Sequence, residues 1–84
     1  MQSLSDSARR VVGARQVLRA IKANTLAEAF IARDADPLLT RPIADACEKG
    51  GIRNTEVESM EQLGALCAIG VKASVAGILK PESK

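Results

Sequence analysis

The stretch AFIARDADP, residues 29–37, predicts the centre of an α/β fold. Its first four residues form a short apolar run bounded by charged residues, which is typical of a central strand covered on both faces. Asp34 and Asp36 follow at once, where a carboxylate can cap the exposed amides of a helix, and Pro37 fits the first helical turn. A buried strand that turns directly into a helix indicates a sheet with helices on its faces.

Helical and strand patterns alternate on both sides of this stretch. Pro42 suits a helix N-terminus better than a helix interior, so the helix after the central strand begins near Pro37 or at Thr40. Gly50 and Gly51 can supply its left-handed stop. In chain order we expect a helix at 5–8, a strand at 11–12, a helix at 14–23, a strand at 29–32, a helix ending at 50, an edge-like strand at 52–57, a helix from 59 and a strand at 74–79.

The first long helix should be amphipathic. Its inner set is Val17, Ala20 and Ile21, and its outer set is Arg15, Arg19 and Lys22. The basic character of the chain is local, because residues 1–24 carry five Lys or Arg residues against one Asp, a net charge of +4. A concentrated positive end on a small protein suits phosphate recognition, although a solvated basic helix face gives the same pattern.

The last predicted helix begins with a capping box. Residues 59–62, SMEQ, have the required form, and the helix should turn Leu63, Leu66 and Cys67 inward. Gly64 is expected to permit close packing rather than to carry chemistry.

Composition excludes several classes of site. The chain has 84 residues and fits one domain, 1–84, and its two cysteines, Cys47 and Cys67, lie among aliphatic residues as small buried hydrophobes. There is no histidine and no CxxC spacing, so we expect no metal, no cofactor and no Cys-His nucleophile. Asp34 and Asp36 are explained by capping more simply than by acid-base catalysis. No apolar run reaches the roughly 18 residues of a membrane span, so we expect a cytoplasmic protein. With no catalytic group left unexplained, we expect a protein that is not an enzyme.

Three motifs together carry a resemblance that covers about residues 9–79. They are VVGARQ at 11–16, FIARDADP at 30–37 and VESMEQLG at 57–64, and they resemble the bacterial YbxF-like proteins. Those proteins are relatives of the ribosomal proteins called L-seven-Ae and L-thirty-e. The resemblance implies a three-layer α-β-α sandwich with a four-stranded mixed sheet, and binding of kink-turn RNA, a sharply bent internal loop with tandem sheared G·A pairs.

The resemblance also implies two RNA-binding surfaces. The first is a glycine turn and the helix that follows it: Gly13, Ala14, Arg15, Gln16, Arg19 and Lys22. A glycine lets backbone approach phosphate, a helix N-terminus presents amides, and a guanidinium can bond guanine O6 and N7, a role we assign to Arg19. The second is the loop before the last strand: Ile69, Gly70, Val71 and Lys72, whose apolar tips would cover an unstacked nucleotide while the lysine reaches phosphate.

The sequence departs from the family pattern at five of these or neighbouring positions. Arg15 and Gln16 stand where the archaeal pattern has asparagine and glutamate, Gly70 where an acidic residue is usual, Lys72 where the residue is often small, and Ala65 where lysine is common. Ile69 and Val71 could equally be loop residues tucked against the sheet.

The expected partner is RNA, either ribosomal RNA or a riboswitch, bound by a monomer that has no small-molecule substrate and no membrane contact. The alternative is a protein-protein interaction or assembly module that keeps the fold without binding RNA. An enzyme domain ranks third, because the chain has no cofactor loop.

Overall fold

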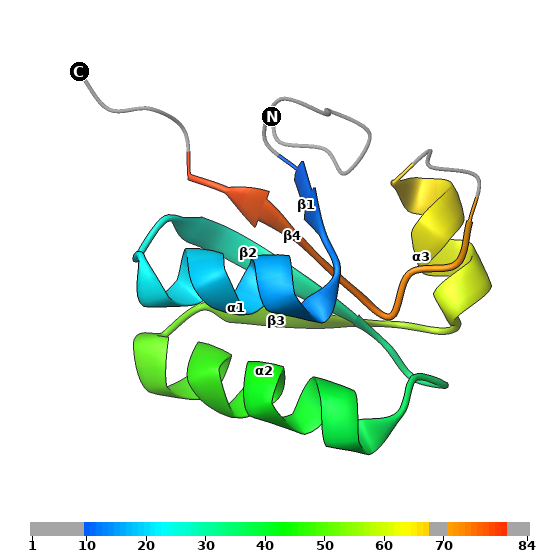
Figure 1. The fold of residues 1–84 in the computed structure, drawn as a ribbon, viewed down its shortest axis with the longest axis horizontal. Helices are drawn as coiled ribbons and strands as arrows, with labels where there is room; N and C mark the ends of the chain where they lie inside the picture. The colour runs from blue at the N-terminus through cyan, green and yellow to red at the C-terminus, as the bar shows by residue number, and fades with distance from the viewer. Residues whose placement is uncertain (1–9, 68–70, 81–84) are drawn as a thin grey trace.

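The computed structural model describes residues 10–67 and 71–80, which form a four-stranded sheet with helices on both faces (Figure 1). The elements alternate strictly along the chain. They are β1 (Arg10–Val12), α1 (Ala14–Lys22), β2 (Leu26–Ala32), α2 (Pro37–Gly50), β3 (Arg53–Val57), α3 (Met60–Leu66) and β4 (Val75–Leu79). The helix expected at residues 5–8 lies outside the described residues. The predicted alternation of strands and helices is confirmed for the rest.

The sheet is mixed, as the resemblance implied. Its strand order is β1-β4-β2-β3, with β2 parallel to β3 and the other neighbouring pairs antiparallel. The predicted central strand is confirmed in β2, which starts three residues earlier than expected, at Leu26. The strand expected at 52–57 is an edge strand, β3, and its exposed polar residues agree with that position.

Two hydrophobic clusters lie on opposite faces of the sheet and make the fold a three-layer α-β-α sandwich. Helices α1 and α2 neighbour each other over one face, where Val17, Ile43 and Val75 are almost fully buried (Figure 1). Helix α3 covers the other face, where Leu63 and Cys67 are buried against the strands. The inner set predicted for α1 is confirmed, with Val17 and Ala20 buried and Ile21 packed at the margin of the cluster.

Helix α2 begins at Pro37, so the alternative start at Thr40 was wrong. Asp36 caps the helix by accepting a hydrogen bond from the Leu38 amide at 3.0 Å, and proline occupies the first helical position. Pro42 lies inside the helix, where these start signals outweigh the loss of one amide donor. Gly51 ends the helix in the left-handed conformation, with φ of 67°, as predicted.

Helix α3 is capped as expected, but one of its inward residues was assigned wrongly. The Ser59 hydroxyl accepts a hydrogen bond from the Gln62 amide at 3.0 Å, and Leu63 and Cys67 are fully buried. Leu66 is 47% exposed. The buried side of this seven-residue helix is centred on Leu63, Gly64 and Cys67, and Leu66 points away from that line.

Candidate nucleic-acid interface

Gly13 forms the sharp turn from β1 into α1 and leaves the start of the helix open. Its φ is 102°, a conformation that side chains strongly disfavour, and no atom lies within 4 Å of where a Cβ would stand. Within the described residues, no side chain caps α1, whereas Asp36 and Ser59 cap the other two helices. Among the described residues, the first amides of α1 therefore have no side-chain acceptor at the positive end of the helix dipole.

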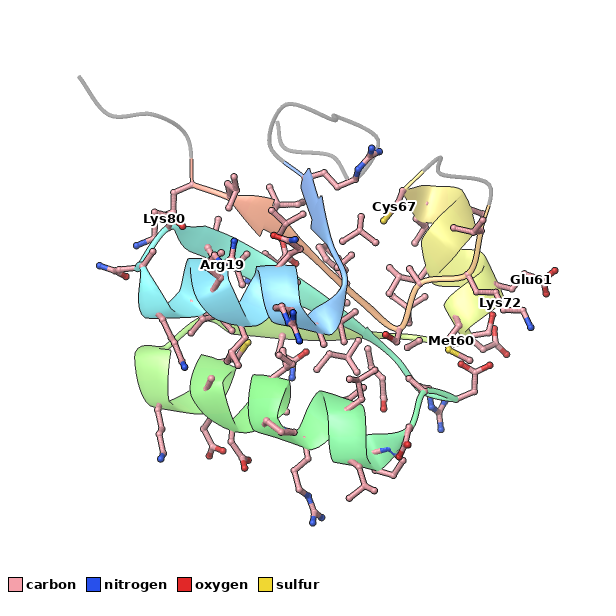
Figure 2. All side chains as sticks on the ribbon, viewed as in Figure 1. Arg19, Met60, Glu61, Cys67, Lys72 and Lys80 are labelled. Atoms are coloured by element: carbon pink, nitrogen blue, oxygen red, sulfur yellow. The ribbon has the colours of Figure 1, made fainter. Side chains whose placement is uncertain are left out.

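Three cations line one side of α1. Arg15, Arg19 and Lys22 are exposed, and with Leu18 they border a shallow hollow of about 240 Å³. They face away from the buried Val17, as predicted, and no ion pair is recorded for them among the described residues. Arg19 is labelled on α1 in Figure 2. This side of the helix can attract phosphate without first breaking an internal salt bridge.

The described part of the second predicted surface lies beside α3. Val71 is 67% exposed and Lys72 is exposed, and both line a hollow that they share with Glu61 and Ala65 (Figure 2). This exposure rules out, for Val71, the alternative that the loop residues are tucked against the sheet. Ile69 and Gly70 lie outside the described residues.

The two surfaces are separate hollows, one along α1 and one beside α3. Arg19 and Lys72 line different hollows, and Figure 2 shows the two side chains well apart. The Gly13 amide, however, donates to the Val75 carbonyl at 2.8 Å. This bond joins the start of α1 to the first residue of β4, which directly follows the segment that carries Lys72.

Gly64 sets the position of that segment. A Cβ at Gly64 would overlap the carbonyl group of Val71, so only glycine allows residues 71 and 72 to run so close to α3. The sequence predicted close packing at this glycine but not the partner that packs there, because the two residues belong to different elements.

The remaining candidate chemistry has a structural explanation. Cys47 and Cys67 are both free and fully buried, and burial raises the pKa of each thiol, an effect that the Arg10 guanidinium partly opposes at Cys67. Arg10 also donates a hydrogen bond to the Cys67 carbonyl. The described residues contain no group of three or more metal-ligating side chains, and none of their helices has the length and apolar composition of a membrane span.

The two aspartates of the opening motif cap two different helices. Asp36 caps α2, which follows it, whereas Asp34 accepts a hydrogen bond from the Met60 amide of α3 at 2.8 Å. The sequence indicated capping for both residues, but no local signal identified a partner 26 positions away.

Comparison with known proteins agrees with the fold and the motifs. RNA-binding protein TTE2299 of Caldanaerobacter subterraneus subsp. tengcongensis is 40% identical over 68 residues, which cover 81% of this chain and 83% of that protein. RNA-binding protein YbxF of Geobacillus stearothermophilus is 34% identical over 70 residues, covering 83% and 85%. The solved structure of the Giardia lamblia 15.5kD RNA binding protein superposes with a TM-score of 0.85 at 28% identity, covering 94% of this chain and 67% of that one.

The family model agrees with these relatives. It matches residues 1–84, and the resemblance to the YbxF-like proteins is confirmed. This chain belongs to the ribosomal protein L7Ae/L30e/S12e/Gadd45 family.

Proposed function

We propose that this protein binds RNA without catalysis, and that its target is a kink-turn whose bent form it stabilises. The observation that carries the proposal is the open N-terminus of α1, with Arg15, Arg19 and Lys22 exposed along one side of the same helix. The free amides at this helix end can donate hydrogen bonds to a phosphate, and the three cations can attract its charge. Relatives named as RNA-binding proteins match more than four fifths of the chain, which supports the same partner.

Each part of the surface has a proposed role in that complex. The Gly13 turn and the amides of Ala14 and Gln16 approach the RNA backbone, while Arg19 donates to the O6 and N7 acceptors of a guanine in the sheared pairs. Arg15 and Lys22 neutralise phosphates along the groove. These roles follow the family resemblance and the exposure of the side chains.

The segment beside α3 completes the surface. Val71 covers an unstacked nucleotide, and Lys72 pairs with a phosphate. Both side chains are exposed, and their segment leads into β4, whose first residue, Val75, accepts a hydrogen bond from the Gly13 amide. The proposal makes the protein a monomeric partner of a cytoplasmic RNA, either ribosomal RNA or a riboswitch.

A competition experiment tests the proposal. The protein is titrated into a labelled kink-turn RNA, and two unlabelled competitors are compared: the same kink-turn, and a duplex in which Watson-Crick pairs replace the sheared G·A pairs. We expect the kink-turn to compete at least tenfold better. Sheared pairs leave guanine O6 and N7 accessible to Arg19, whereas a Watson-Crick RNA duplex holds them in a major groove too deep and narrow for side chains. Equal competition would leave only nonspecific phosphate contact and reject kink-turn recognition.

An apolar surface on α2 favours the alternative, an interaction module for another protein. Leu38 is 86% exposed and Leu39 is 44% exposed, and Leu38 borders a hollow with both prolines of the helix, Pro37 and Pro42. Salt separates the two functions. RNA affinity should fall steeply as salt rises, with a slope of about −0.7 to −0.9 per phosphate contacted, whereas an apolar protein interface should change little.

A further inference from the structure

The backbone of Met60, the first residue of α3, links the turn after β2 to the segment that carries Val71 and Lys72. Its amide donates to the Asp34 carboxylate at 2.8 Å, and its carbonyl accepts from the Ala73 amide at 3.1 Å. Asp34 belongs to the turn after β2, Met60 is the first residue of α3, and Ala73 directly follows Lys72. Two hydrogen bonds therefore lead from Asp34 to the segment that carries Val71 and Lys72.

The turn that bears Asp34 is itself held firmly in place. The Arg33 amide donates to the Val57 carbonyl at 2.8 Å, which ties the turn to the end of β3. Ala35, the next residue after Asp34, is buried in the cluster beneath α3. The backbone of Asp34 is therefore held in place, and its carboxylate can hold the Met60 amide at the start of α3.

A carboxylate is an unexpected group at an RNA surface. Asp34 is exposed, and its charge repels phosphate, so electrostatics alone would make RNA binding tighter without it. Its hydrogen bond to Met60 gives a different reason for its presence. A carboxylate that accepts from the first amide of a helix both satisfies that donor and complements the helix dipole.

We propose that Asp34 is a positioning residue for RNA recognition: through the backbone of Met60 it sets where Val71 and Lys72 lie. The inference rests on the proposed function, since it assigns those two side chains to the RNA surface. Gly64 also positions this segment, because its missing Cβ lets Val71 lie directly against α3. The segment is then held by α3 at two points, of which Asp34 controls the one at the start of the helix.

Three variants separate positioning from charge. Asp34→Ala removes the charge and the acceptor, Asp34→Asn removes the charge and keeps an acceptor, and Asp36→Ala removes the same charge from the cap of a different helix, α2. Electrostatics alone predicts equal or tighter kink-turn binding for all three. The positioning role predicts about threefold to tenfold weaker binding for Asp34→Ala only, because the other two variants keep an acceptor for the Met60 amide.

Coupling to the proposed contact residue sharpens the test. If Asp34 acts through the 71–72 segment, Lys72→Ala should cost less affinity in the Asp34→Ala background than in the wild type, whereas its cost should be unchanged in the Asp36→Ala background. Binding of Asp34→Ala as tight as the wild type, equal losses for Asp34→Ala and Asp34→Asn, or full additivity with Lys72→Ala would overturn the proposal.

An RNA-free readout keeps this inference distinct from the proposed function. Amide hydrogen exchange at Ala73, whose donor bonds the Met60 carbonyl, should be faster in Asp34→Ala than in Asp36→Ala or the wild type. Unchanged exchange at Ala73 overturns the link from Asp34 even where RNA binds. A different outcome rejects only the RNA role: the wild type shows no preference for kinked RNA, yet Ala73 exchanges faster in Asp34→Ala. The hydrogen-bonded link from Asp34 to Ala73 would then remain supported.

Discussion

Arg19 projects from α1 one helical turn beyond Arg15, on the exposed side of the helix (Figure 2). Its substitution tests the proposed guanine contact. Arg19→Ala should weaken kink-turn binding by about 1 to 3 kcal/mol, the usual value of a bidentate base contact, and should leave the unfolding transition nearly unchanged. Gel-shift titration measures the loss. Arg53→Ala is the control, because it removes the same charge from the edge strand β3. An unchanged gel-shift midpoint for Arg19→Ala would reject the guanine contact.

Gly64 is the residue whose replacement should damage the fold most specifically. Gly64→Ala places a methyl group against the Val71 carbonyl and should lower the free energy of unfolding by about 1 to 3 kcal/mol, the range typical of overpacking. Urea unfolding followed by circular dichroism measures the change. Gly50→Ala is the matched control, since its Cβ would meet only the Ile52 side chain at 3.4 Å. Equal stability of the two variants would contradict the close approach of residues 64 and 71.

The two buried thiols make stability depend on pH in a defined direction. Burial raises the pKa of Cys47 and Cys67 in the folded state, so their contribution is constant below the ordinary thiol pKa and the free energy of unfolding falls as pH rises above it. Urea midpoints at pH 7 and pH 9.5 should therefore differ more for the wild type than for a Cys47→Ala, Cys67→Ala double variant. An identical pH dependence in both proteins would show that the thiols are not buried as described.

At the scale of elements, helix ends were predicted better than helix faces. Asp36 with Pro37 and Ser59 with Gln62 are local signals, and the helices start where these signals indicate. The misplaced Leu66 shows the limit, because the buried side of a helix with only seven residues depends on what packs against it. The Asp34–Met60 bond shows the same limit, since the pairing of β2 with β3 brings its two partners together from distant parts of the sequence.

The turn into α1 offers a test of one element by itself. Gly13→Ala should cost about 1 to 3 kcal/mol of stability, because the φ of 102° is strained for any residue with a Cβ although space is available. It should also weaken RNA binding by misdirecting the first amides of α1. Thermal unfolding and RNA titration of the same variant measure both effects. Wild-type values in both assays would show that this turn is neither strained nor in contact with RNA.

At the scale of the whole molecule, the sequence predicted the sandwich and the basic helix but not how far apart the two surfaces lie. Arg15, Arg19 and Lys22 follow from helical spacing alone, so their common side was predictable. The place of Val71 and Lys72 depends on long-range contacts to Met60 and Gly64. Arg19 and Lys72 line two different hollows, one along α1 and one beside α3, rather than one shared surface.

The bending of RNA on binding is the measurement that tests this account most directly. Fluorescence energy transfer between dyes at the two ends of a kink-turn reports the angle between its arms. At low magnesium concentration, where the free RNA is extended, addition of the protein should raise the transfer efficiency to a plateau, because a ligand that binds the bent state shifts the population toward it. No rise in efficiency at protein concentrations that saturate binding would contradict the proposal that this surface grips the bent form.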